Sequence, residues 1–167
     1  MRITALVIAT IMLLLTAGVG LLGTNRSLKD ATDIDKIVKP VKAQINALAA
    51  AGNADAKRLK DLAGKTGRLR GGAVLFGLTA LLAIGLIVMM FLNKYVIYTA
   101  GGLAILAILS ILVNPSYDMG PTAPASARSL AIFVGVVAAL GAGAAYGASA
   151  LKARKLAKQQ HLAHATA

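Results

Sequence analysis

The sequence contains no cysteine, no tryptophan and no glutamate, and it has few charged residues of any kind. Without cysteine, the chain can form neither a disulfide nor a thiolate metal site, and it has no cysteine nucleophile. Charged residues make up 14% of the chain, whereas soluble domains carry roughly 25%. Hydrophobic residues make up 57% of it. This composition indicates a membrane protein.

Four apolar runs are each long enough to cross a bilayer, which takes about 20 residues in a helix. They cover residues 3–22, 73–92, 95–113 and 130–150. We therefore predict an all-α, polytopic membrane protein with four transmembrane helices and a partly helical extramembrane loop between the first and the second. The layout is similar to that of tetraspanins and claudins, but the cysteine-bearing loop signatures of those families are absent, so nothing is transferred from them.

These runs divide the chain into six segments. They are transmembrane helix 1 (residues 1–23), an amphipathic polar loop (24–71), a transmembrane hairpin of helices 2 and 3 (72–114), a proline-rich loop (115–128), transmembrane helix 4 (129–150) and a basic C-terminal tail (151–167).

Two of these assignments have an alternative. Only Asn93 and Lys94 separate the second and third runs. One helix through both would be about 60 Å long, twice the hydrocarbon thickness, so a hairpin is favoured. The first run, preceded by Arg2, also resembles a signal peptide. Its apolar core is longer than the 7–15 residues typical of such peptides, so we expect an uncleaved span.

The polar loop carries an apolar helical face with alternating spacings of four and three residues. Its members are Ile34, Val38, Val41, Ile45 and Leu48. Pro40 interrupts the pattern, so it either kinks the helix or starts a second one. Gly52 and Asn53 are typical of a helix stop followed by an N-cap. From there we expect a short helix that ends at Gly64.

Basic residues flank the apolar segments and give the chain a formal net charge of +12. Those singled out are Lys29, Lys36, Lys39 and Lys42 in the loop and Lys152, Arg154, Lys155 and Lys158 in the tail. They predict contact with anionic lipid headgroups or with an acidic partner protein, and for the loop helix we favour the membrane surface. No nucleic-acid module is visible, so nucleic acid is not an expected partner. The distribution of lysine and arginine leaves the orientation open.

The last apolar run contains a row of small residues spaced four apart. They are Ala131, Gly135, Ala139, Gly143 and Gly147. Glycine disfavours helices in water, but in lipid the helix forms regardless and small residues let a second helix approach closely. We predict that this row is a packing groove, either for another helix of the same chain or for a partner subunit.

The four runs contain no Asp, Glu, Lys, Arg or His, the residues that normally support proton relays and charge-coupled transport inside membranes. His161 and His164 lie in the tail, and we interpret them as solvated residues because two ligands at a helix end make a poor metal site. Asp33 and Asp35 stand among lysines and are interpreted as solvated ion pairs. We therefore expect no catalytic, cofactor-binding or metal site and no small-molecule substrate.

These observations favour a non-catalytic membrane protein that is not an enzyme. The leading hypothesis is an accessory or scaffolding subunit of a larger membrane complex, or a self-associating protein, in a bacterial inner membrane or another plasma-type membrane. The alternative is a component of an oligomeric channel or small-solute transporter. A third possibility is a membrane-bound enzyme subunit whose active site belongs to another chain.

Overall fold

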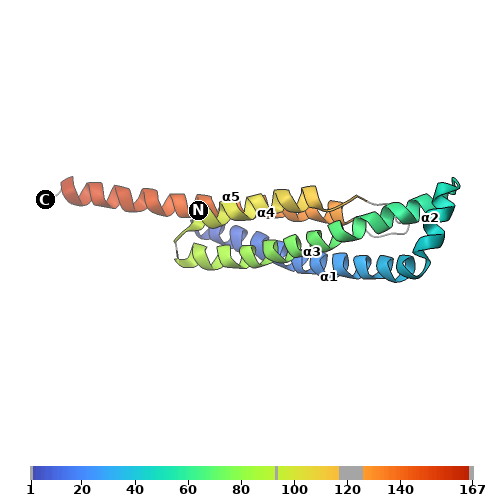
Figure 1. The fold of residues 1–167 in the computed structure, drawn as a ribbon. Helices are drawn as coiled ribbons and strands as arrows, with labels where there is room; N and C mark the ends of the chain where they lie inside the picture. Colours follow the sequence, from blue (N-terminus) through green and yellow to red (C-terminus); the bar gives the residue numbers. More distant parts are fainter. Residues whose placement is uncertain (1, 93, 117–125, 166–167) are drawn as a thin grey trace.

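Four long antiparallel helices make up most of the protein, as the computed structural model shows (Figure 1). The structure describes residues 2–92, 94–116 and 126–165. Its elements are α1 (Arg2–Val38), the 3₁₀ turn η1 (Lys39–Val41), α2 (Lys42–Ala50), α3 (Ala54–Leu92), α4 (Val96–Val113) and α5 (Ala127–Ala165). No strand occurs among the residues described, so the predicted all-α class is confirmed.

Four helical segments are long and apolar enough to cross a membrane, as the sequence predicts. They are Ile3–Ala50, Ala54–Leu92, Val96–Val113 and Ala127–Ala157. Many large apolar side chains on the outer surface of these segments are exposed, for example Leu81 at 65% and Leu112 at 63%. Such a surface suits a lipid environment, because large exposed apolar areas are rare on soluble monomers.

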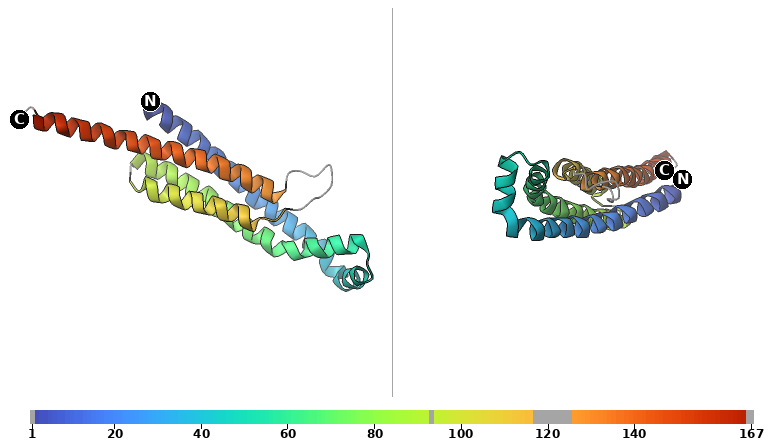
Figure 2. Two further views of the ribbon diagram at one scale, coloured as in Figure 1. Left: turned by 90° about the horizontal axis from the view of Figure 1, so that it is seen from above. Right: turned by 90° about the vertical axis from the view of Figure 1, so that its right-hand side faces the viewer.

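The long helices pack side by side in chain order, and α5 closes the bundle by packing against α1. The N-terminus, the turn between α3 and α4 and the C-terminal part of α5 lie toward one end (Figures 1 and 2). At the opposite end, α1 and α3 extend beyond α4 and are joined through α2. We call this extension, residues 24–72, the head, and the part of α5 that projects at the other end, residues 151–165, the tail.

Helices α1 and α3 are longer than the sequence indicates. The segment boundaries placed at 23/24 and 71/72 both fall inside continuous helices. The short helix expected to stop at Gly64 continues to Leu92 instead. Glycine costs a helix about 1 kcal/mol relative to alanine, but it does not remove a hydrogen bond as proline does. Packing of Leu69 and Gly72, both buried, therefore outweighs the glycine penalty.

The reversal between α2 and α3 follows the predicted stop and cap. Gly52 has φ +93°, a conformation that glycine adopts without strain. The amide N–H of Asn53 donates to the Leu48 carbonyl at 3.0 Å, and that of Gly52 to Ala49 at 3.2 Å, as in a Schellman motif. The Asn53 Oδ1 atom then accepts bonds from the Asp55 and Ala56 amides, both at 3.0 Å, and so caps α3.

Pro40 ends α1 and lies in η1, after which α2 begins at Lys42. Of the two outcomes predicted for this proline, the structure shows a break with a new helix. Ser126 is the N-cap of α5, where its Oγ accepts the Ser129 amide at 3.2 Å. Within the proline-rich loop, residues 117–125 lie outside the described residues, as does Asn93 in the turn between α3 and α4.

Candidate functional site

The inner face of α5 is built mostly from small residues that recur at steps of three or four positions. Its buried members are Ala127, Ala131, Val134, Ala138, Ala142, Ala145 and Ala148. Gly141 lies on the same face, where an added Cβ would be 3.0 Å from Leu13 Cδ2 of α1. The helices of this bundle therefore approach one another over alanine and glycine, the packing expected of membrane helices.

The predicted small-residue row is only partly on this face. Ala131 and Gly135 are buried inside the bundle, whereas Ala139 and Gly143 are exposed and Gly147 is partly exposed. An added Cβ on Gly143 or Gly147 would meet no atom within 4 Å. The reason is geometric: steps of four residues advance about 40° around a helix of 3.6 residues per turn. Over the row this drift reaches about 160°, so its five members do not all pack against other helices of this chain, and a partner-subunit contact of the exposed members stays a prediction.

The apolar face predicted for the polar loop lies mainly against protein. Ile34, Val38 and Ile45 are buried in a cluster with Leu69 of α3 and Ala127 of α5. The remaining members are exposed, Val41 at 36% and Leu48 at 51%. Because α1 continues straight out of its apolar stretch, its inner face stays turned toward α3. The placement of this face at a membrane surface, favoured above, is therefore corrected.

The basic residues singled out in the loop project from the head. Lys36 lies 3.9 Å from Asp33, and Lys39 lies 3.5 Å from Asp35. Lys29 and Lys42 are exposed, and no ion pair joins either of them to the residues the structure describes. On the tail, Arg154 and Lys155 are exposed and Lys152 is partly exposed, while the side chain of Lys158 lies outside the described residues.

Polar contacts join distant parts of the chain, both within the head and between the head and α4. Asp35 of α1 binds Arg70 of α3 at 2.6 Å. At the C-terminal end of α4, the Arg68 guanidinium donates to the Val113 carbonyl at 3.2 Å and to the Leu112 carbonyl at 3.1 Å. These two carbonyls accept no hydrogen bond from within the helix, and they lie at the negative end of the helix dipole. The Arg68 cation therefore stabilises this end of α4.

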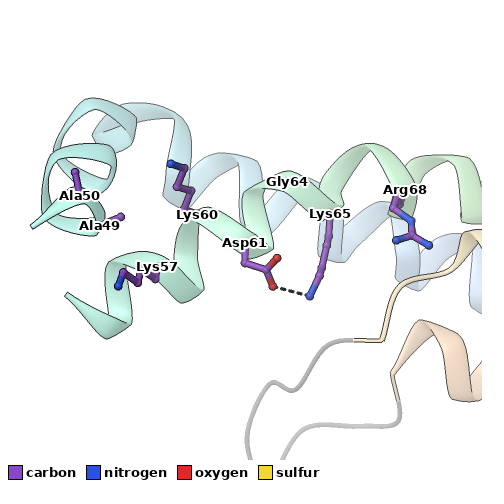
Figure 3. A pocket seen from close by; sticks show the side chains of 8 residues that line it. All are labelled: Ala49, Ala50, Lys57, Lys60, Asp61, Gly64, Lys65 and Arg68. Carbon is purple, nitrogen blue, oxygen red and sulfur yellow. Dashed lines mark hydrogen bonds and ion pairs between the residues drawn. The ribbon is translucent and has the colours of Figure 1, made fainter. Parts of the chain in front are cut away.

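An open groove of about 640 Å³ lies between α2 and the first turns of α3 (Figure 3). Its lining residues are Ala49, Ala50, Lys57, Lys60, Asp61, Gly64, Lys65 and Arg68. Lys65 is bound to Asp61 at 2.6 Å. Lys57 and Lys60 form no ion pair with any residue described in the structure. We call this site the head groove; it presents an excess of positive charge beside the small residues Ala49, Ala50 and Gly64.

A second concavity, of about 540 Å³, lies at the opposite end of the bundle, between the start of α4 and the end of the bundled part of α5. Its lining residues are Tyr95, Val96, Ile97, Tyr98, Tyr146, Ser149, Ala150, Ala153 and Arg154. We call it the tyrosine site. Three tyrosines and one arginine line it, together with small and aliphatic residues.

Threonine hydroxyls inside the apolar helices donate to carbonyls of their own helices. Thr16 donates to the Met12 carbonyl at 2.9 Å, and Thr79 donates to the Leu75 carbonyl at 2.7 Å. Both residues are fully buried. The Thr24 hydroxyl is within hydrogen-bond distance of two carbonyls, that of Gly20 at 3.0 Å and that of Ala73 in α3 at 3.2 Å. These groups stabilise helices and their contacts.

Comparison with known proteins gives no assignment: no protein-family model, no curated protein and no solved structure matches this chain. The candidate sites are therefore defined by their own geometry and charge.

The head groove, the Arg68 cap and the tyrosine site were missed by the sequence analysis. Lys57 and Lys60 are visible in the sequence as part of a basic stretch, but only the fold of α2 over α3 makes them the wall of a groove. The proximity of Tyr146 and Arg154 to Tyr98 depends on the antiparallel register of α4 and α5. The one available signal was the position of Tyr95 and Tyr98 at the edge of an apolar run, where aromatic residues with polar tips are enriched in membrane proteins.

Proposed function

We propose that this protein is a non-catalytic accessory or scaffolding subunit of a membrane protein complex, anchored by four membrane-crossing helices in a bacterial inner membrane or another plasma-type membrane. The head groove is the surface that holds the partner. The observation that carries the proposal is the pair of cations Lys57 and Lys60, which form no ion pair with the described residues, beside the small residues Ala49, Ala50 and Gly64.

The chemistry of the groove favours an acidic segment of a partner protein. Four bases and one aspartate line it, and that aspartate is already bound to Lys65. Opposite charges across an interface accelerate association and fix its register. The small residues of the groove let a partner's backbone approach closely. The head is also joined to α4 through Arg68, and the ion pair of Asp35 and Arg70 holds α1 to α3 within it, so a partner held there is tied to the membrane anchor.

The alternative of a channel or transporter component has less support. The buried centre of the bundle is filled by apolar side chains such as Leu13, Leu86 and Leu103, each 0% exposed. A pore would then have to form between copies of the chain. The outer faces of the bundle that would line such a pore carry large exposed aliphatic side chains.

The proposal is tested by purifying the full chain from its own membranes in a gentle detergent and identifying copurifying chains by mass spectrometry. We expect a second protein in stoichiometric amount. The charge-reversing variant Lys57→Glu/Lys60→Glu should lose it. The control, Lys36→Glu/Lys42→Glu, reverses two charges on the head outside the groove and should keep it. A clean homo-oligomer would support the channel alternative, and equal retention by both variants would contradict the groove.

A further inference from the structure

The tyrosine site lies at the level where the bundle would leave the hydrocarbon core. Helix α4 has 18 residues and is therefore about 27 Å long, close to the hydrocarbon thickness of about 30 Å. The two ends of α4 then lie at opposite membrane surfaces. Tyr95 and Tyr98, at its start, are 67% and 77% exposed. Phenol rings are favoured at this depth, because the ring contacts lipid and the hydroxyl contacts water.

The side chains from the two helices converge on one depth. Side chains on a helix lean toward its own N-terminus. The N-terminus of α4 is at the tail end of the bundle, so Tyr98 leans outward from the membrane. The N-terminus of α5 is at the head end, so Arg154 leans back toward the membrane. Arg154 is eight residues beyond Tyr146, or about 12 Å, which places its guanidinium among the headgroups.

Among the residues that the structure describes, no acidic side chain pairs with Arg154. Five of the six aspartates, Asp30, Asp33, Asp35, Asp55 and Asp61, are in the head. The sixth, Asp118, lies in the connection from α4 to α5, outside the described residues. The end that carries the tyrosine site adds Lys94, Lys152 and Lys155. This charge attracts an anion and repels a ligand with a positively charged headgroup.

We propose that the tyrosine site binds the headgroup phosphate of an anionic glycerophospholipid. The Arg154 guanidinium donates to the phosphate oxygens, a geometry that suits its planar fork. The hydroxyls of Tyr95, Tyr98 and Tyr146 and that of Ser149 supply further donors around the same concavity. Val96, Ile97, Ala150 and Ala153 form the apolar wall along which the acyl chains descend.

The inference rests on the proposed membrane insertion but is independent of the partner at the head groove, because the two sites lie at opposite ends of the bundle (Figure 1). A free phosphate ion would use the same polar donors and leave the apolar wall unused. The two sources of phosphate are therefore separable by experiment.

The test uses the full chain in detergent, exchanged into equal amounts of phosphatidylglycerol and phosphatidylcholine with the same acyl chains, with bound lipid counted by native mass spectrometry. We expect preferential retention of phosphatidylglycerol. Arg154→Gln should lower its affinity about fivefold, the loss of a direct hydrogen bond to the phosphate. The matched control, Lys155→Gln, removes a charge from the same turn outside the site and should change the affinity less than about twofold, because its exposed ammonium donates no hydrogen bond to the bound phosphate and is screened by salt. The variant Tyr98→Phe/Tyr146→Phe, which removes hydroxyls only, should also weaken binding.

Three results would overturn the proposal. Equal retention of the two lipids would mean that insertion is right and the site is wrong. Equal losses in Arg154→Gln and Lys155→Gln would mean that only the overall charge of the tail matters. Displacement of the lipid by inorganic phosphate, with phosphate bound in its place, would identify a free anion as the ligand. Circular dichroism of each variant checks that helix content is unchanged, and if Arg154→Gln fails that check the tyrosine variant decides.

Discussion

Gly72 of α3 lies directly against the carboxamide of Asn114, the residue that ends α4. An added Cβ on Gly72 would be 2.6 Å from Asn114 Cγ and 2.9 Å from its Nδ2. Asn114 is 1% exposed, and its Nδ2 donates to the Ser110 carbonyl at 2.8 Å. Its Oδ1 has no hydrogen-bond partner among the described residues. The absent side chain of Gly72 therefore makes room for the carboxamide that closes the end of α4.

Gly72→Ala should destabilise the protein by about 1–3 kcal/mol, the usual cost of inserting a methyl group into a filled site. The control is Gly67→Ala on the same helix, where an added Cβ meets nothing within 4 Å. This control should stabilise the protein by up to about 1 kcal/mol through helix propensity. Thermal unfolding in detergent, followed by circular dichroism, measures both. If Gly72→Ala is as stable as Gly67→Ala, the close contact with Asn114 does not exist.

Arg68→Gln should cost about 0.5–1 kcal/mol, because the guanidinium is bonded to two terminal carbonyls of α4 and opposes its helix dipole. The control, Arg58→Gln, removes a charge elsewhere on the same helix. It should have little effect, since Arg58 is exposed and bonds to none of the described residues. Unfolding free energies in matched detergent compare the two variants. Equal losses would indicate that net charge, and not the cap, sets the stability.

The ion pair between Asp35 and Arg70 should couple α1 to α3 in the head. We expect a double-mutant cycle with Asp35→Asn and Arg70→Gln to give a coupling energy of about 0.5–1 kcal/mol, the upper range for exposed pairs, because Asp35 is only 22% exposed. The coupling should fall when salt is raised, because mobile ions screen exposed charges. A coupling of zero at low salt would mean that this contact contributes nothing to the head.

Gly141 and Gly143 should respond differently to the same substitution. Gly141→Leu places a large side chain where Leu13 already lies 3.0 Å from an added Cβ, so it should disrupt the contact between α5 and α1. Gly143→Leu faces open space and should leave the stability of the monomer within about 0.5 kcal/mol of the wild type. Unfolding in a denaturing detergent titration separates them. Similar losses in both would place Gly143 inside the bundle, contrary to the structure.

Hydropathy was sufficient to predict the four membrane-length helices, because each apolar run is a local property of the chain. The stop at Gly52 and the cap at Asn53 were equally local. The course of α3 through Gly64 was not predictable in this way, since it depends on burial of Leu69 against α1. The contact of Gly72 with Asn114 joins residues that are far apart in the sequence, and it is fixed only by the register in which α3 and α4 pack.

The division of the small-residue row has a similar explanation. A spacing of four residues marks one helical face over two positions, Ala131 and Gly135, and then drifts away from it. The inner face follows alternating steps of three and four, which pass through Ala138 and Ala145. The many small residues of α5 indicate that another helix can pack closely against it. Only the structure shows which of these residues make that contact.

The account depends most directly on a membrane-crossing bundle with the head and the tail at opposite surfaces. The chain has no cysteine, so single cysteines can be introduced and labelled with a membrane-impermeant maleimide in sealed, uniformly oriented vesicles. Ala51→Cys in the head and Ala157→Cys in the tail should label from opposite sides, and Leu81→Cys in the middle of the apolar part of α3 should stay unlabelled after the vesicles are opened. Labelling of both ends from one side, or rapid labelling of Leu81→Cys, would contradict the account.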